Sequence, residues 1–385
     1  MPGVHRPTRP LRVRQNPAPH MPVDQGAGPE HTDLGLQQTG GMMGCHKGPQ
    51  TRCHKRAPST FAAVVLAMSV WAMPSSGRAD AGLTLVARIP LGAVSGRIDH
   101  LAIDSTRQRL FIAELGNDTI GVVDLAGAVL LTRIAGFSEP QGIEYDPVTD
   151  QFFVANGGSG QVSILSGSDF HLVMQTQLAG DADNIRLAGS RGHTTVYVGY
   201  GDGGIAALDP ASGAVIADYP LAAHPEGFQI DDLLHQIYVN MPFAQDIAAV
   251  DLTSGQATGN WQSPGAAGNF PMALDAGGRR LYVAYRVPPR LVVFDTQTGT
   301  PVQDIPVCAD PDDVFLDDAR AQAYVICGQG VIAVMSTAGK LVEVGRVGTQ
   351  SGARTGLFVP GLDRLFVAVR ADGVAPAEIR VYQPD

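Results

Sequence analysis

The chain has 385 residues, with 27 Lys and Arg against 37 Asp and Glu, which gives a net charge of −10 at neutral pH. Residues 82–385 alone hold 18 basic and 33 acidic residues, a net charge of −15, and Lys340 is their only lysine. A surface this acidic repels phosphate backbones and anionic lipid headgroups, which argues against nucleic acid and membrane surfaces as partners.

The N-terminal part of the chain does not have the pattern of a folded domain. Residues 1–41 are rich in Pro, Gly, Arg and His without apolar periodicity, and we interpret them as a non-structural extension that precedes the true start at Met42 or Met43. Residues 42–81 contain a basic stretch, an apolar run of 13 residues (Phe61–Met73) and an A-x-A that ends at Ala81. This order is typical of a secretory signal peptide, and the run is shorter than the roughly 20 residues of a membrane span. We expect a periplasmic or secreted protein that is not inserted in a membrane after cleavage.

The rest of the chain is a sevenfold repeat. Short apolar segments, most of them ending in Asp, begin with "LAID" at Leu101 and end with "LFVP" at Leu357, and their starts lie 42 to 44 residues apart. In each unit a polar turn leads to a second strand, as in 109–115, then a third, as in 119–125, and a more variable fourth, as in 300–308. Four short strands in a period of about 40–45 residues are the signature of a β-propeller.

The ends of the repeat array predict how the ring closes. The seventh unit stops after its third strand, at Tyr382, and the segment 83–92 ("LTLVARIPLG") is available as the missing fourth strand. Such pairing removes free sheet edges. The predicted fold is therefore all-β, a single seven-bladed propeller over 82–385 whose blade seven is completed by the N-terminal strand. We expect it to be a monomer.

The repeats resemble those of a known family. "QFFVANGGSGQVSIL" (151–165) and "RLYVAYRVPPRLVVFDTQTG" (280–299) are similar to the YVTN-type repeats of secreted YncE-like propellers, and the resemblance covers nearly all of 83–385. It implies the fold and says little about activity. More distant relatives include propeller lactonases, the streptogramin lyase and the haem-binding domain of nitrite reductase. Lactonases and the lyase hold a divalent ion at the top of the channel.

Unusual residues gather where the chain leads into the seven inner strands. In a propeller these segments surround the top of the central channel, and here they carry carboxylates, amides and two histidines, whereas the bottom turns are ordinary. Side chains of this kind often only satisfy backbone groups at turns. As a set they predict a binding site for a small molecule or a periplasmic protein. The predicted ligand-binding residues are Asp99, Gln141, Asn184, Asn269, Arg286 and Arg354.

The carboxylates of this rim are also candidate metal ligands. Asp183, Glu226, Asp312 and Asp313 suit a hard cation, Ca²⁺ or Mg²⁺. Zn²⁺ or Cu²⁺ is less favoured, because His100 and His224 come from blades one and four, nearly across the ring. The resemblance to the lyase implies that either histidine could act as a base beside such an ion.

Cys308 and Cys327 are the cysteines that remain after signal cleavage. Export makes a disulfide between them plausible, but two buried free thiols are an equal alternative, because a sequence does not give their separation.

Three functions fit these observations. The first is an exported binding module that takes a ligand, an ion or a protein at its acidic top rim. The second is a divalent-metal-dependent lactonase, hydrolase or lyase at the same rim, and the third a redox accessory protein with non-covalent haem or copper. Residues 82–385 contain no G-x-S-x-G, H-E-x-x-H or C-x-x-C-H motif, which removes support for common hydrolase nucleophiles and covalent haem. A shared fold does not choose among the three.

Overall fold

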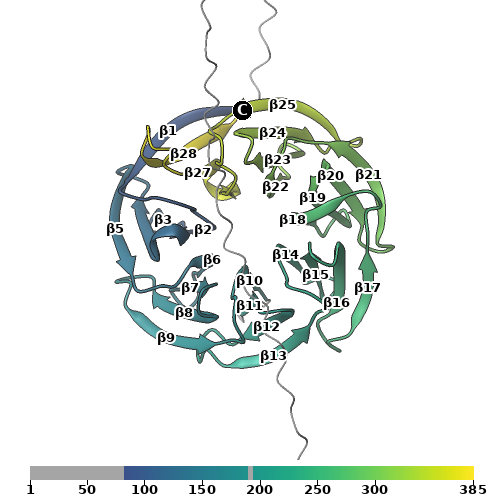
Figure 1. Cartoon of the computed structure of the whole chain (residues 1–385), viewed down its shortest axis with the longest axis horizontal. Coiled ribbons are helices and arrows are strands. Elements are labelled where there is room, and N and C mark those ends of the chain that lie inside the picture. The colour runs from purple at the N-terminus through teal and green to yellow at the C-terminus, as the bar shows by residue number, and fades with distance from the viewer. Residues whose placement is uncertain (1–81, 190–193) are drawn as a thin grey trace, which may run out of the picture. The chain divides into compact units, whose positions relative to one another are not determined.

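Seven antiparallel sheets of four strands each make up the described part of the chain. They are arranged in a ring (Figure 1). The computed structural model describes residues 82–189 and 194–385, so the expected extension (1–41) and signal peptide (42–81) lie outside the described residues. Helical structure in the described part consists of two single 3₁₀ turns, η1 (Leu115–Asn117) and η2 (Pro360–Leu362), and neither has the length and apolar composition to cross a membrane. The predicted seven-bladed β-propeller is confirmed.

The strands of each blade run in chain order from the channel outward. Blade one comprises β2 (Leu101–Asp104), β3 (Arg109–Glu114), β4 (Thr119–Asp124) and β5 (Val129–Ala135). Blade two comprises β6 (Pro140–Asp146), β7 (Gln151–Asn156), β8 (Gln161–Ser166) and β9 (Leu172–Gln177). Blade three comprises β10 (Ile185–Ala188), β11 (Thr195–Tyr200), β12 (Gly204–Leu208) and β13 (Val215–Pro220).

The remaining blades follow the same order until the last. Blade four comprises β14 (Phe228–Asp231), β15 (Gln236–Met241), β16 (Asp246–Asp251) and β17 (Ala257–Trp261). Blade five comprises β18 (Ala267–Asp275), β19 (Arg280–Val287), β20 (Pro289–Asp295) and β21 (Thr300–Pro306). Blade six comprises β22 (Pro311–Asp317), β23 (Gln322–Cys327), β24 (Val331–Ser336) and β25 (Val342–Gly348). Blade seven comprises β26 (Gly356–Val359), β27 (Arg364–Val369), β28 (Ala377–Pro384) and, outermost, β1 (Leu83–Gly92).

Blade seven closes the ring with strands from both ends of the chain. β1 pairs antiparallel with β28, from Leu83 opposite Pro384 to Gly92 opposite Ala377. In Figure 1 the blue-purple β1 lies along the yellow β28. The predicted completion of blade seven by the N-terminal strand is confirmed.

The core is divided among interfaces between neighbouring blades. Phe111 of blade one stacks on Phe152 of blade two with ring centroids 4.6 Å apart, and both rings are fully buried. Burying a side chain of this size stabilises the fold by about 2 kcal/mol relative to leaving it in water. The second and third strands are apolar on both sides because each blade packs against two neighbours.

The Asp that ends most inner strands shapes the turn on the bottom face. Asp104 is fully buried, and its Oδ1 accepts hydrogen bonds from the backbone N–H groups of Thr106 and Arg107, both at 3.0 Å. Equivalent bonds to turn N–H groups are made by Asp146, Asp231 and Asp317. The repeated Asp therefore has a structural role, because it satisfies turn N–H groups that the sheet leaves unpaired.

The innermost strand of blade seven lies one residue earlier than its sequence suggests. The residue that begins each repeat packs opposite a matching apolar residue of the second strand, and in blade seven this is Gly356, opposite Val367, not Leu357. A Cβ on Gly356 would lie 2.4 Å from the carbonyl oxygen of Phe366 and 2.6 Å from Cδ1 of Ile326. Only glycine fits there, and the missing apolar side chain hides the register from the sequence pattern.

Candidate functional site

The central channel contains a cavity of about 910 Å³ that opens on the top face, where the chain leads into the inner strands. Each repeat begins with the residue that lies opposite the second strand, such as Leu101 in blade one, opposite Ile112. The residues two positions before these surround the opening of the cavity. All seven line the cavity, and we call them the mouth ring: Asp99, Gln141, Asp183, Glu226, Phe270, Asp312 and Arg354.

Three potential metal ligands from blades three and four converge at this mouth. Asp183, His224 and Glu226 each offer one ligand atom, and these atoms all lie within 4.8 Å of one another. Nε2 of His224 lies 4.0 Å from Oδ2 of Asp183. We call these three residues the triad.

The orientation of His224 suits a metal ligand. Its Nδ1 lies 2.6 Å from the carbonyl oxygen of Gly201, and because a carbonyl only accepts, Nδ1 carries the proton. Nε2 is then left facing the carboxylates. A histidine that donates its other N–H to a backbone carbonyl is the usual arrangement around protein-bound metals.

The sheet holds the backbone of this segment in place. The N–H of Glu226 donates to the carbonyl of Asn240 at 2.9 Å, and the N–H of Asn240 donates to the carbonyl of Gly227 at 3.0 Å. The ladder between β14 and β15 thus continues beyond β14 to the residues of the mouth. Side chains carried by a rigid element keep their positions more accurately than those on a free loop.

Without a cation nearby, ionisation of the two triad carboxylates is unfavourable. Burial, with the negative charges of Glu226 and Asp99, raises the pKa of Asp183 well above its ordinary value. Burial, with the charges of Asp312 and Asp99, raises the pKa of Glu226 to about 7. Carboxylates packed together with few hydrogen bonds favour a proton or a metal ion among them.

His100 is a fixed cation on the other side of Asp183. Its Nδ1 lies 2.8 Å from Oδ1 of Asp99 and its Nε2 lies 2.6 Å from Oδ1 of Asn184. Burial opposes a charge on this ring, but the hydrogen bond and charge of Asp99 outweigh it and raise the pKa of His100 to about 9. Both ring nitrogens are therefore occupied at neutral pH. His100 therefore has no free ring nitrogen to offer a metal ion, unlike His224.

An arginine cluster fills the mouth between blades five and seven. Arg286 pairs with Asp310 and Asp312 and lies 3.7 Å above the ring of Phe270. Arg354 pairs with the same two carboxylates, at 3.1 Å and 2.8 Å. Asp312 thus pairs with two guanidinium groups and is not one of the three converging ligands, although burial outweighs the two arginines and raises its pKa.

The other predicted residues have different surroundings. Asp313 accepts the N–H of Gly356 at 2.7 Å, and burial, only partly offset by His100, raises its pKa to about 7. Gln141 lines the cavity and reaches Asp181 at 3.4 Å. Asn269 is fully buried and donates to the Oδ1 of Asn240 and the carbonyl of Asp246, which makes it a support of the wall rather than part of its surface.

Several lining residues were missed by sequence reasoning. Arg97 pairs with Asp99 at 2.8 Å, and Phe243, 79% exposed, lies at the opening in the turn after β15. Nothing in their local sequence marks them. Glu144 and Arg186 also line the cavity, and both occupy the second position of their repeats. Comparing that position across the seven repeats would have found this pair.

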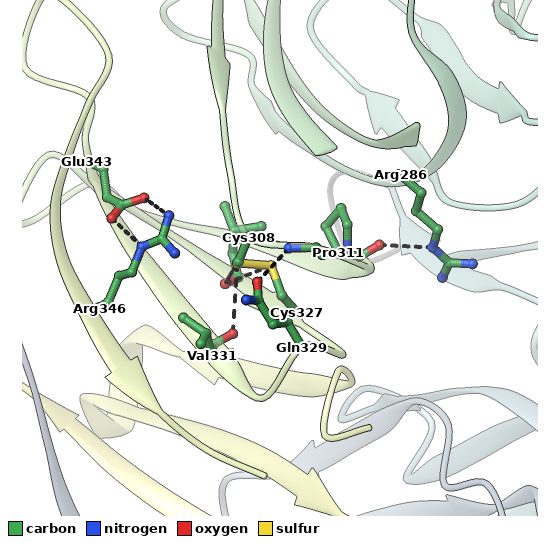
Figure 2. Close-up of a disulfide and its surroundings, with 10 residues drawn as sticks. Arg286, Cys308, Pro311, Cys327, Gln329, Val331, Glu343 and Arg346 are labelled. Carbon is green, nitrogen blue, oxygen red and sulfur yellow. Dashed lines mark hydrogen bonds and ion pairs between the residues drawn. A yellow bond between two sulfur atoms is a disulfide. The ribbon is translucent and has the colours of Figure 1, made fainter. Parts of the chain in front are cut away.

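A disulfide joins Cys308 and Cys327 beside the arginine cluster, with their Cα atoms 5.9 Å apart. Figure 2 shows this bond, with Arg286 contacting the carbonyl of Pro311 farther along the same segment. The N–H of Ala309 donates to Oε1 of Gln329 at 3.0 Å. The link ties the segment that carries Asp310 and Asp312 to β23.

Comparisons with known proteins agree with the fold and go no further. No family profile matches the chain, and no curated protein matches it. Among solved structures 1813 chains match. One of them, from a crystal structure of a mitotic checkpoint complex, aligns with a TM-score of 0.66 and 12% identity over 84% of this chain and 98% of that chain. At this identity the likeness shows a shared fold alone, and the chain is a seven-bladed β-propeller whose function must be argued from its channel.

Proposed function

We propose that this protein is a binding module that holds a divalent cation with Asp183, His224 and Glu226 and takes a small molecule into its central channel. The convergence of the three ligand atoms within 4.8 Å carries this proposal. Two carboxylates and one imidazole, carried by the segments that lead into β10 and β14, form the donor set. The cavity beside them gives a ligand access.

The donor set favours a particular kind of ion. Ca²⁺ and Mg²⁺ prefer oxygen ligands throughout, whereas a set that includes imidazole suits Zn²⁺ and related transition metals. The histidine therefore shifts our preference from Ca²⁺ or Mg²⁺ to Zn²⁺. Three protein ligands leave at least one position open toward the cavity, where a ligand oxygen or water can bind.

Metal analysis tests the proposal directly. The full 385-residue chain would be expressed without a histidine tag, purified without chelator and analysed for metals. We expect about one equivalent of divalent metal per chain, as in a single tetrahedral protein site. Glu226→Gln should lose most of it. Asp202→Asn, an exposed carboxylate that also lines the cavity, is the matched control and should retain it.

The opposite result would be clear. If the protein contains no metal even after dialysis against Ca²⁺, Mg²⁺, Zn²⁺ and Cu²⁺, the triad is not a metal site. Equal loss of metal in Glu226→Gln and Asp202→Asn would show that the metal is bound by surface charge and not by the triad.

The proposal includes export and kinship with the secreted YncE-like propellers. The YVTN-type repeats and the signal-peptide pattern of 42–81 support it. The disulfide between Cys308 and Cys327 supports export as well, because such bonds persist mainly in oxidising compartments. The ligand would then be a small molecule or a partner protein of the periplasm.

Catalysis by a metal-dependent hydrolase or lyase is the second candidate. It is favoured by the open position on the triad and by the positive charge of His100, which would act on a ligand oxygen through its field alone, since both ring N–H groups donate to Asp99 and Asn184. A charged ring does not serve as a base, so a base role would fall to another group. If the metal-loaded protein converts lactones and Glu226→Gln does not, this candidate replaces simple binding.

A further inference from the structure

At one position of the repeat, three blades place polar residues in the channel and three others place apolar residues there. This position is the second, one residue after the start of each repeat, below the mouth ring. Three consecutive blades place Glu144, Arg186 and Gln229 there. The next three place Ala273, Phe315 and Leu357 there. All six line the cavity, so at this repeat position one half of the wall is polar and the other half apolar.

The polar half offers a donor and an acceptor that no protein group uses. Within the described residues, Glu144 makes no hydrogen bond or ion pair. Arg186 donates only to the carbonyl of Ile185, and its Cζ lies 5.7 Å from the ring centroid of Phe228. Glu144 and Arg186 come from neighbouring blades, and although burial raises the pKa of Glu144, the charges of Arg186 and His100 oppose that shift. The Nε2 of Gln229 donates to the carbonyl of Met272 at 3.0 Å, which leaves its Oε1 as a second acceptor.

The apolar half carries side chains that the core only partly covers. Phe315 and Leu357 pack against the core clusters of blades six and seven on one side and line the cavity on the other. Leaving such surface in contact with channel water forgoes hydrophobic stabilisation. A ligand with an apolar face would recover it.

We propose that the channel recognises a neutral, amide-containing small molecule whose apolar face lies on Phe315 and Leu357. The amide N–H donates to Glu144 and the amide carbonyl accepts from Arg186. A ligand with net charge is disfavoured, since an anion meets Glu144 and a cation meets Arg186. The cavity of about 910 Å³ is large enough for a drug-sized molecule. This inference rests on the proposed function, because it names the ligand class of the same channel.

Three related naphthalenes test the recognition of the amide. 1-Acetamidonaphthalene has both the N–H and the carbonyl, 1-acetylnaphthalene keeps only the carbonyl, and 1-naphthoate is an anion. Their affinities for the full-length protein would be measured by calorimetry. We expect the amide to bind about tenfold more tightly than either of the others, which corresponds to about 1.4 kcal/mol.

Variants test whether the polar side of the wall gives the preference for the amide and the apolar side gives the affinity shared by both compounds. Glu144→Ala should weaken the amide about tenfold and leave the ketone unchanged, which removes the preference between them. Leu357→Glu should weaken both compounds alike. Leu233→Glu, which makes the same change at a side chain that is 73% exposed on the bottom face, is the control and should change neither.

The outcomes separate this inference from the metal proposal. Glu144 lies outside the triad, so Glu144→Ala should retain its metal. An amide preference that persists in metal-free protein supports the inference even if the triad binds nothing. The inference is overturned if none of the three compounds binds, if the amide has no advantage over the ketone, or if Glu144→Ala leaves that advantage intact.

Discussion

Two buried acidic residues, one on each face of the propeller, have opposite surroundings. On the bottom face, Asp317 is 2% exposed and accepts hydrogen bonds from Tyr324, from the side chain of Arg320 and from a turn N–H. On the top face, Asp183 is 5% exposed and faces Glu226 and Asp99 with few donors nearby. Burial is similar at the two positions, but only the first carboxylate is satisfied.

This difference separates structural from functional acids. A buried carboxylate that is fully hydrogen-bonded stabilises the fold, and removing it leaves its partners unpaired. A buried carboxylate beside other carboxylates destabilises the fold until a cation or a proton arrives. The number of donors around each acid is therefore more informative than its burial.

The largest effect on stability is expected at the bottom face. Asp317→Ala removes the nearest acceptor of the Tyr324 hydroxyl and one of the two carboxylates that pair with Arg320, the other being Asp363. It should lower the free energy of unfolding by about 4 kcal/mol. Urea unfolding monitored by fluorescence measures this. Asp318→Ala, the exposed neighbour, should change it by less than about 0.5 kcal/mol. Equal effects at the two positions would contradict the structural role of Asp317.

The next effect concerns how the top face is held together. The Cys308→Ala/Cys327→Ala variant loses the link beside the arginine cluster and should be less stable by about 3 kcal/mol, since the bond closes a loop of some 20 residues. Dithiothreitol should destabilise the natural protein by the same amount and leave the variant unchanged. A variant that unfolds at the same urea concentration as the natural protein would show that the rim does not need the disulfide.

The smallest effect is a pH dependence of the metal-free protein. Because the folded-state pKa of Glu226 and that of Asp313 are raised to about 7, the folded state holds more protons than the unfolded chain above pH 4.5. Stability should therefore fall as pH rises from about 5 to 7, by an amount on the order of 2 kcal/mol. The raised pKa of His100, about 9, extends the fall to higher pH.

Urea unfolding in chelator at pH 5, 6, 7 and 8 measures this slope. Glu226→Gln/Asp313→Asn should flatten it between pH 5 and 7, and a saturating divalent metal should reduce it in the natural protein. Stability that rises over this range would mean that the rim carboxylates are already satisfied, as on the bottom face.

The sequence predicted the fold well because the fold is repetitive. A period of 42 to 44 residues, read seven times, averages out irregular units, and the free segment 83–92 has one suitable place. The error in blade seven arose where the pattern lost its apolar side chain, at Gly356. Periodicity locates an element through its side chains, so it fails where backbone contact excludes one.

The site was harder to predict because topology only brings segments together. Sequence placed His100 and His224 on one rim, but hydrogen bonds that depend on side-chain orientation give His100 to Asp99 and Asn184 and leave His224 facing Asp183. Asn269 also lies just before the start of a repeat, but its side chain is buried in the wall, where it donates to Asn240. The mouth could be predicted from the repeat, whereas the choice of partners within it could not.

The pairing of β1 with β28 also determines the order in which the molecule is completed. Thr84 and Asp385, joined by a hydrogen bond, are separated by 301 residues, so β1, the first of the described strands, is without its partner until β28 has been synthesised. Blades one to six consist of neighbouring hairpins and can form as they emerge, while closure depends on contacts of the longest range. A chain cut short before β28 would lose both that strand and the partner of β1. Only a chain that has been synthesised through β28 can therefore close the ring.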